Sequence, residues 1–224
     1  NCLLTTELDN ANILLSRNSS IRKEENLSSK RLSKDEREKQ IQNAAKEIFL
    51  KKGFFNTTMD DVILCSGMSV GGVYHYYKNI YEIFYDIMSR GLDYGEERSL
   101  LKTGGKHTLE TFVAYMLDKI FDDNEYKDLF TILLEGIARD QKLLEIYKKL
   151  NIKYIDILHR AFKDGDIPND VLEDPFLIFF THSLLMGYTS FGPLGGKEAF
   201  QKNRAIVKNM ILLYLNESQG RKDK

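Results

Sequence analysis

The sequence predicts an all-α protein, in which a small three-helix head with a helix-turn-helix precedes a larger helical body. Apolar residues recur at helical spacing, and no stretch alternates apolar and polar residues as a strand does. Only three prolines occur in 224 residues, so long helices have few breaks. With 42% apolar and 29% charged residues, the composition is that of a soluble globular protein. We expect about nine helices in total, about six of them in the body.

Charge is distributed unevenly along the chain. The formal net charge is only −1, which argues against binding of nucleic acid through overall charge. Residues 30–80 hold nine Lys and Arg against six Asp and Glu, a net charge of +3, whereas residues 81–224 hold twenty against twenty-three, a net charge of −3. This asymmetry fits DNA contact at one end of the molecule. The alternative is chance variation between the two parts, because the difference is small.

Residues 1–32 are expected to form a flexible arm or tail. A cluster of Lys and Arg near the end of this segment would suit an arm that enters a DNA minor groove. Frequent Asn, Ser and Thr favour a solvated tail instead, and we prefer this interpretation. No basic segment precedes an apolar run here, which predicts a protein without a signal peptide, located in the cytoplasm.

The first helix of the head is predicted to begin at Ser33. Glu36 follows three residues later, where the two side chains can form a capping box. Gly53 ends the helix, because glycine readily adopts the left-handed conformation of a C-cap. The apolar face of this helix consists of Ile41, Ala45, Ile48 and Phe49.

Residues 57–80 have the pattern of a helix-turn-helix. Thr58 is a good N-cap, and Asp61 lies three residues later, where its carboxylate faces the start of the helix. Gly67 ends this helix, and Ser69 begins the next one only two residues later. Two short helices around a tight turn that contains glycine are typical of a DNA-binding motif.

The second motif helix has an unusual composition for an element that only packs. Gly71 and Gly72 each cost about 1 kcal/mol in a helix relative to alanine, but they let the backbone approach another surface closely. Hydroxyl, imidazole and ammonium groups follow, which can bind phosphate oxygens or base edges. The alternative is an ordinary helix pair closed by aromatic residues. The residues predicted to contact DNA are Thr58, Ser69, Val70, Gly71, Gly72, Tyr74, His75, Tyr76 and Lys78.

Positions within the recognition helix suggest two kinds of contact. Because the N-terminal part of such a helix enters the major groove, Val70, Gly72 and His75 are predicted to lie nearest the base edges. Tyr74 and Tyr76 are predicted to contact phosphates.

The head resembles the DNA-binding domain of the TetR family of transcriptional repressors. The resemblance covers residues 35–85 and rests on several motifs in fixed order, whereas the rest of the chain matches only in length and helical character. It implies a homodimeric repressor that binds a palindromic operator and is released by a small apolar or amphipathic effector. The residues that carry it are Ile41, Ala44, Ala45, Phe49, Gly53, Phe54, Thr57, Thr58, Asp61, Val62, Gly67, Met68, Ser69, Gly71, Val73, Tyr74, His75, Tyr76, Tyr77, Lys78, Asn79, Glu82, Ile83 and Phe84.

Three positions depart from the family pattern. Ile63 replaces a small residue, which predicts looser packing between the two motif helices. Tyr77 replaces a common phenylalanine, and we expect little change from it. Ile80 replaces a common lysine, which removes one expected phosphate contact unless Lys78 supplies it.

The body is predicted to contain helices over residues 80–102, 107–121, 126–138, 140–163, 176–191 and 198–217. We therefore divide the chain into a tail at 1–32, a DNA-binding domain at 33–80, and a ligand-binding and dimerisation domain at 81–224. In the resembled family the central body helices enclose a pocket, although an aromatic and methionine-rich stripe is more often plain core. The residues expected to line a pocket are Phe112, Tyr115, Met116, Phe130, Glu135 and Arg139.

Residues 176–191 contain no charged side chain. Sixteen residues are too few to cross a bilayer, which takes about 20, so no membrane association is expected. The segment would be either a core helix or, with residues 198–217, half of a four-helix dimer seam like that of the resembled family. The predicted seam residues are Phe179, His182, Leu185, Met186, Val207, Met210, Ile211 and Tyr214.

No pattern for catalysis, for a metal or for a cofactor stands out. Asp156 and His159 lie three residues apart, but a helical metal site needs a set of ligands from several helices. Phosphate loops and Cys-x-x-Cys motifs do not occur. The sequence therefore favours a DNA-binding regulator that is not an enzyme. The alternative is an all-α enzyme or interaction module with an incidental helix-turn-helix.

Overall fold

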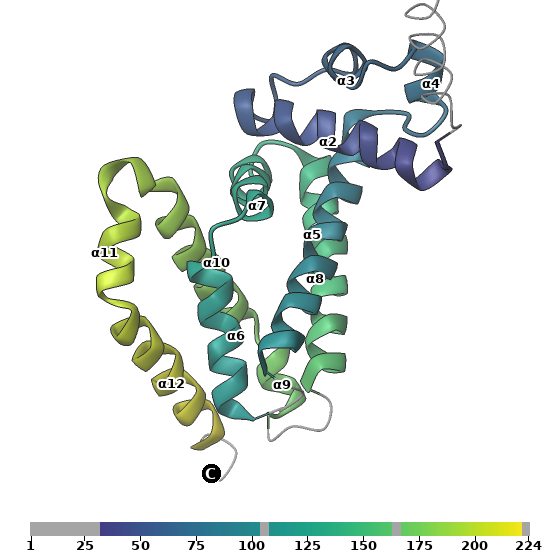
Figure 1. Ribbon diagram of the computed structural model, residues 1–224. Coiled ribbons are helices and arrows are strands. Elements are labelled where there is room, and N and C mark those ends of the chain that lie inside the picture. Colours follow the sequence, from purple (N-terminus) through teal and green to yellow (C-terminus); the bar gives the residue numbers. More distant parts are fainter. Residues whose placement is uncertain (1–31, 104–107, 163–166, 221–224) are drawn as a thin grey trace, which may run out of the picture. The chain divides into compact units, whose positions relative to one another are not determined.

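The computed structural model describes residues 32–103, 108–162 and 167–220. Within these ranges every regular element is a helix, so the predicted all-α fold is confirmed (Figure 1). The chain divides into two compact units between Lys39 and Gln40. The predicted tail lies outside the described residues, apart from Leu32.

The head contains three helices, α2 (Lys34–Lys52), α3 (Met59–Ser66) and α4 (Val70–Tyr74). The predicted capping box at the start of α2 is present: the Ser33 backbone N–H donates to Glu36 at 2.7 Å, and the Glu36 N–H donates to the Ser33 hydroxyl at 3.2 Å. These hydrogen bonds lower the pKa of the Glu36 carboxyl. Gly53 ends α2 with a φ of 77°, the left-handed conformation that glycine tolerates.

The body begins with the long helix α5 (Ile80–Thr103), followed by α6 (Leu109–Phe121), α7 (Glu125–Gly136) and α8 (Gln141–Phe162). After these come α9 (Asn169–Leu172), α10 (Pro175–Ser190), the 3-10 helix η1 (Gly192–Leu194), α11 (Gly196–Lys202) and α12 (Arg204–Gly220). The predicted helices are found with boundaries shifted by a few residues, and two differences stand out. The sequence gives no sign of the one-turn helix α9. The single helix predicted over 198–217 is wrong, because Asn203 separates α11 from α12.

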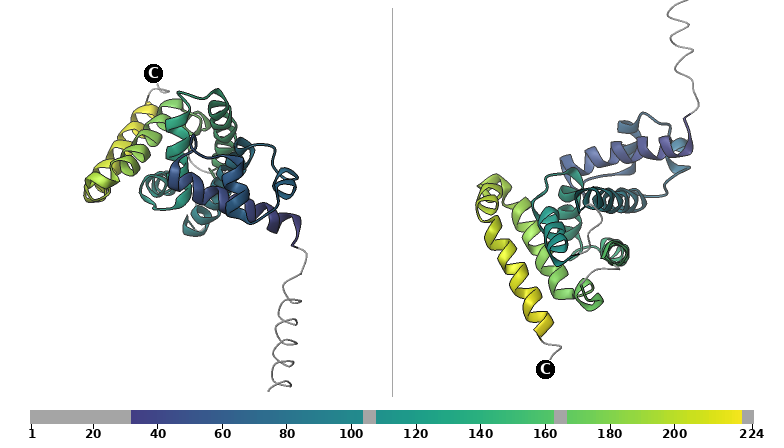
Figure 2. Two further views of the ribbon diagram at one scale, coloured as in Figure 1. Left: turned by 90° about the horizontal axis from the view of Figure 1, so that it is seen from above. Right: turned by 60° about the horizontal axis from the view of Figure 1, so that its bottom comes forward.

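The body helices pack in two groups. Helices α5 and α8 run side by side, and α7 packs against both (Figure 1). Helix α10 packs against α6 and α7, and α12 packs against α6. Both views of Figure 2 show α11 and α12 on the outer side of this second group. Across the described residues, no helix combines the length and the apolar content that crossing a bilayer requires.

Two clusters of buried apolar residues form the core of the described chain. One cluster lies among α6, α8, α10 and α12, and Phe112, Ile120 and Ile211 are among its fully buried residues. The other joins the head helices to α5, α7 and α8, and it includes Phe49 and Leu133. The core of the head therefore continues past the predicted domain boundary at residue 80.

Candidate nucleic-acid interface and ligand cavity

Local hydrogen bonds fix the helix-turn-helix. At the start of α3, the Thr58 N–H donates to the Asp61 carboxylate at 2.8 Å and the Asp61 N–H donates to the Thr58 hydroxyl at 3.2 Å. Gly67 ends α3 with a φ of 66°. The Ser69 hydroxyl then accepts a hydrogen bond of 3.1 Å from the Gly72 N–H at the start of α4. Both caps and the turn therefore follow the predicted pattern.

Asp61 also accepts a hydrogen bond from Lys52 Nζ at 2.6 Å. This hydrogen bond, with those from Thr58, lowers the pKa of the Asp61 carboxyl to about 2. The Asp61 carboxylate is thus paired within the head. Thr58 donates its own hydroxyl hydrogen to Asp61 at 2.7 Å, so this hydroxyl is engaged in the cap.

The nine residues predicted to contact DNA lie in or beside α3 and α4. Seven are exposed, including Val70 at 59% and Tyr74 at 46%, while Gly72 and Tyr76 are half-buried. The inward face of the motif consists of Val62, Val73 and Tyr77, which are buried in the head core. Helix α4 ends at Tyr74, so the later residues of the predicted set follow in a turn and do not extend the helix.

The two glycines of α4 differ in their surroundings. A Cβ atom at Gly71 would meet nothing within 4 Å. At Gly72, a Cβ atom would lie 3.0 Å from the Ser69 hydroxyl oxygen and 3.4 Å from the Met68 methyl carbon. A side chain at Gly71 would therefore project outward, whereas one at Gly72 would press on the cap of the helix.

The Tyr77 hydroxyl makes hydrogen bonds that the phenylalanine common in the family could not make. This finding corrects the expectation that tyrosine at this position changes little. Its hydroxyl accepts a hydrogen bond from the Gln42 amide nitrogen at 2.6 Å and donates to Asp86 at 3.1 Å. Gln42 is itself buried in α2. The hydroxyl thus links α2, the segment after α4 and α5. Ile80, the other departure at this end of the motif, packs against the head core.

A Tyr77→Phe variant is expected to be less stable than the wild type by about 1–3 kcal/mol, because the buried Gln42 amide loses its acceptor. Urea unfolding followed by circular dichroism measures this difference. Tyr74→Phe, at an exposed tyrosine of the same motif, is the control and should change stability by less than about 0.5 kcal/mol. Equal stability of the two variants would contradict the proposed link.

The described part of the body contains a cavity of about 150 Å³ that opens among α5, α6, α7 and α10. The side chains that line it are mainly apolar or aromatic. Of the six residues that the sequence predicts for a pocket, Tyr115 and Phe130 line this cavity. Phe112 and Met116 are buried in the core beside it. Glu135 and Arg139 lie elsewhere, around a hollow beside Phe54 and Phe55. The structure therefore does not bring the six residues together.

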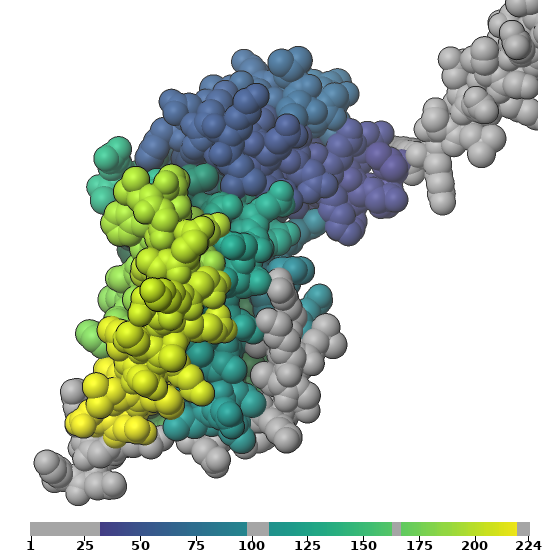
Figure 3. Space-filling view, turned by 60° about the vertical axis from the view of Figure 1, so that its left-hand side comes forward, coloured from purple at the N-terminus to yellow at the C-terminus, as the bar shows by residue number. Residues whose placement is uncertain are grey.

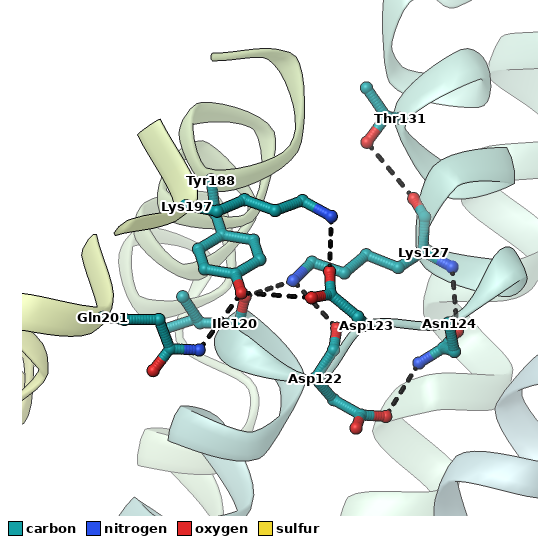
Figure 4. Close-up of polar contacts among 9 residues, drawn as sticks. All are labelled: Ile120, Asp122, Asp123, Asn124, Lys127, Thr131, Tyr188, Lys197 and Gln201. Atoms are coloured by element: carbon teal, nitrogen blue, oxygen red, sulfur yellow. Dashed lines mark hydrogen bonds and ion pairs between the residues drawn. The ribbon is translucent and has the colours of Figure 1, made fainter. Parts of the chain in front are cut away.

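A polar cluster lies where α6 gives way to α7 (Figure 4), and three of its members, Asp122, Asn124 and Lys127, line the cavity. Lys127 donates through its ammonium group to the backbone carbonyls of Ile120 and Asp122, and it lies 3.9 Å from the centroid of the Tyr188 ring. Burial lowers the pKa of this ammonium group to about 8. Nearby, Lys197 donates to Asp123 at 2.7 Å, which lowers the pKa of the Asp123 carboxyl. Sequence patterns gave no sign of this cluster, because its members come from α6, α7, α10 and α11.

An apolar surface lies on α10 and α12, although its residues are only partly those that the sequence predicts. Among the eight predicted seam residues, Phe179 and Met210 are exposed, and Met186 and Tyr214 are half-buried. The remaining four are buried in the core of the chain itself, which corrects their assignment to a seam: His182, Leu185, Val207 and Ile211. Exposed apolar residues that the prediction missed are Phe176, Ile206 and Leu213.

The two helices of this surface adjoin at the start of α10. The ring centroids of Phe176 and Tyr214 are 4.9 Å apart, and the Tyr214 hydroxyl donates to Asp174, the N-cap of α10. Figure 3 shows the outer surface of α11 and α12, which no other described helix covers. We name the exposed residues Phe176, Phe179, Ile206, Met210 and Leu213 the apolar face.

The capped α3–α4 pair, with its buried inner face and its exposed polar outer face, defines a helix-turn-helix protein of the DNA-binding class. Residues 41–87 match the family model described as bacterial regulatory proteins, tetR family. These residues include both helices of the motif, so the head of the chain contains a DNA-binding domain of the tetR family.

Two relatives and one solved structure extend this comparison. The uncharacterized HTH-type transcriptional regulator YfiR of Bacillus subtilis (strain 168) is 41% identical over 87 residues, which are 39% of this chain and only 42% of that protein. The HTH-type transcriptional regulator QacR of Staphylococcus aureus is 28% identical over 131 residues, 57% of this chain and 69% of that protein. GusR of Salmonella enterica has a similar fold, with a TM-score of 0.64 at 18% identity over 84% of this chain and 100% of that one.

Proposed function

We propose that the protein represses transcription by binding a palindromic operator as a homodimer, and that a small molecule in the body cavity releases it. Residues 33–80 would bind DNA, and residues 81–224 would hold the effector and form the dimer. No catalytic role is proposed. The observation that carries the proposal is the outward surface of α4 and of its C-cap, where Val70, Gly71, Tyr74 and His75 are exposed on a motif whose inner face is buried.

DNA recognition would rely on a close approach of α4 to the major groove. Gly71 has no side chain on the exposed face, so the backbone can come near the DNA. The hydroxyl of Ser69, the imidazole of His75 and the ammonium of Lys78 can then bind phosphates or base edges. Pairing of Asp61 with Lys52 limits repulsion between the motif and the phosphates.

Dimerisation would bury the apolar face. Contiguous exposed apolar surface is uncommon on soluble monomers and often marks an interface. A two-fold axis would bring two copies of the apolar face together in one self-complementary seam. Two heads on such a dimer would match the two half-sites of a palindrome.

Effector release would use helices that belong both to the cavity and to the head core. Met88 of α5 lines the cavity and also lies in the cluster that contains the head residues Phe49 and Val73. A ligand that binds better to one arrangement of α5 and α7 would shift the population toward it. Operator affinity would fall only if that arrangement no longer matches the half-site spacing.

The direct test is selection of bound fragments from genomic DNA, followed by binding measurements on the recovered sequence at several salt concentrations. The expected result is a palindromic sequence whose affinity falls steeply as salt rises. Recovery of no enriched sequence would contradict the proposal and favour the alternative of an incidental helix-turn-helix.

A Tyr76→Phe variant is expected to bind all operator sequences more weakly by about 1 kcal/mol, because a hydrogen bond to phosphate is lost. Among the described residues, the Tyr76 hydroxyl has no hydrogen-bond partner, so it is free to contact DNA. Fluorescence anisotropy on the selected operator and on point-mutated operators measures the change. Tyr85→Phe on α5 serves as the control. A changed sequence preference with full affinity would assign Tyr76 to a base instead.

A further inference from the structure

The cavity in the body has the size and lining of a site for one small ring. Its volume of about 150 Å³ matches that of an apolar cavity that holds benzene. Most of the wall is apolar or aromatic, with Met88, Leu92, Tyr126, Phe130 and Leu185 among the lining residues. Such walls favour a compact apolar body and leave few places for polar groups.

Four charged side chains also line the cavity, and three of them already have partners. Lys127 donates to two backbone carbonyls. Asp118 forms an ion pair with Arg204 at 3.5 Å. Asp122 accepts a hydrogen bond from the Asn124 amide at 2.9 Å. These three groups are therefore engaged in holding the wall together.

Lys119 is the fourth charged residue, and its position differs. Among the residues that the structure describes, its ammonium group makes no hydrogen bond or ion pair, and it lies 3.3 Å from the centroid of the Tyr154 ring. It lines both the main cavity and a smaller adjoining hollow of about 20 Å³ that reaches Tyr147 and His182. An ammonium group that contacts an aromatic face but pairs with no anion can still donate hydrogen bonds to a carboxylate.

We propose that the effector is a small monocarboxylate with a compact apolar body, bound with its carboxylate at Lys119. This inference rests on the proposed function, because it names the ligand class of the same cavity. The ring or branched chain fills the apolar part of the cavity, and the carboxylate accepts hydrogen bonds from the ammonium group. Benzoate has this chemistry and a suitable size, and it is the probe of choice.

The electrostatics around Lys119 agree with an anionic ligand. Burial lowers the pKa of Lys119 to about 7. Without a partner anion, the charged form of this side chain is therefore destabilised by desolvation. His182 is held neutral, since burial first and Lys119 second lower its pKa to about 3. A carboxylate beside Lys119 favours the charged ammonium form and offsets the cost of its desolvation.

Isothermal titration of the full-length protein with three probes of similar shape tests the charge requirement. The probes are benzoate, neutral benzamide and cationic benzylammonium. Benzoate is expected to bind at least about tenfold more tightly than either of the others, because only it forms an ion pair with Lys119. Tighter binding of benzylammonium would overturn the proposal, since Asp118 or Asp122 would then determine the preference. No binding of benzoate at millimolar concentration would also overturn it.

The Lys119→Met variant tests the residue. Methionine keeps an apolar stem of similar length, so the fold should be retained, which circular dichroism checks. Benzoate affinity is expected to fall by about 10- to 100-fold, while benzamide affinity, which includes no ion pair with Lys119, falls much less. Lys148→Met, at an exposed lysine of α8 outside the cavity lining, is the matched control and should leave both affinities unchanged. Unchanged benzoate affinity in Lys119→Met overturns the proposal.

If Lys119→Met does not fold, a second variant decides the question. Lys119→Arg keeps the positive charge and should retain the preference for benzoate over benzamide, and loss of that preference would overturn the assignment. Operator binding without any probe is measured separately. Benzoate that binds through Lys119 without weakening operator binding would support the site but contradict its role in release. Absence of operator binding would contradict the proposed function alone.

Discussion

A Gly71→Leu variant is expected to lose operator affinity by at least about 100-fold while it keeps its fold, because a base contact is worth about 1–3 kcal/mol and more than one would be lost. A Cβ atom at this position meets nothing within 4 Å, so the head has room for the new side chain. Leucine also favours a helix over glycine by about 1 kcal/mol. The leucine would hold the α4 backbone away from the groove. Anisotropy with the selected operator measures affinity, and urea unfolding measures stability.

Two further glycine variants make the Gly71 result specific. Gly71→Ala adds a single methyl group and should weaken binding much less than Gly71→Leu. Gly72→Leu should lower both affinity and stability, because its side chain would press on the Ser69 cap. Wild-type affinity in Gly71→Leu would exclude the exposed face of α4 from the DNA interface.

A Phe179→Glu variant is expected to be monomeric at micromolar concentration, where the wild type should be a dimer. The Phe179 side chain is 57% exposed in the single chain. Burying a phenylalanine contributes about 1.5–3 kcal/mol, and a two-fold seam contains the substitution twice, so the dissociation constant should rise by at least about 100-fold. Sedimentation measures the mass, and operator affinity should fall with it because each head binds one half-site in the proposed dimer.

Ile152→Glu is the matched control for this variant. Ile152 is 63% exposed on α8, outside the apolar face, so the same change there should leave the dimer intact. Substitutions at Leu185 or Ile211 would be less informative, since both side chains are buried in the core of the single chain and a charge there would disturb folding. A wild-type protein that sediments as a monomer would contradict both the seam and the model of two heads on one operator.

The turns and caps of the head were predictable because their chemistry is local. Thr58 and Asp61 form their capping box within four residues, and Gly67 needs only its own left-handed conformation. The role of Tyr77 was not predictable, because its partners Gln42 and Asp86 lie far from it along the chain. A residue type alone does not reveal which groups a fold brings to its hydroxyl.

Apolar patterns identified the body helices but not which apolar face of a helix turns inward. Helix α10 is apolar on all sides, so the pattern could not separate the buried Leu185 from the exposed Phe179. The same reason applies to the cavity, where the buried Phe112 and the lining Tyr115 come from one helix with a broad apolar face. Only the arrangement of neighbouring helices distinguishes these positions.

The shared core of the head and the body limits how such a protein can be recombined. Leu133 and Leu143 of the body are fully buried in the same cluster as Phe49 and Val73 of the head. Residues 33–80 on their own would expose the apolar residues that they contribute to that cluster. We therefore do not expect them to fold stably when they are joined to an unrelated effector domain. A functional chimaera must also carry the matching surfaces of α5, α7 and α8. If α4 contacts the operator as proposed, new operator specificity is easier to obtain by changing the exposed residues of α4 than by exchanging whole heads.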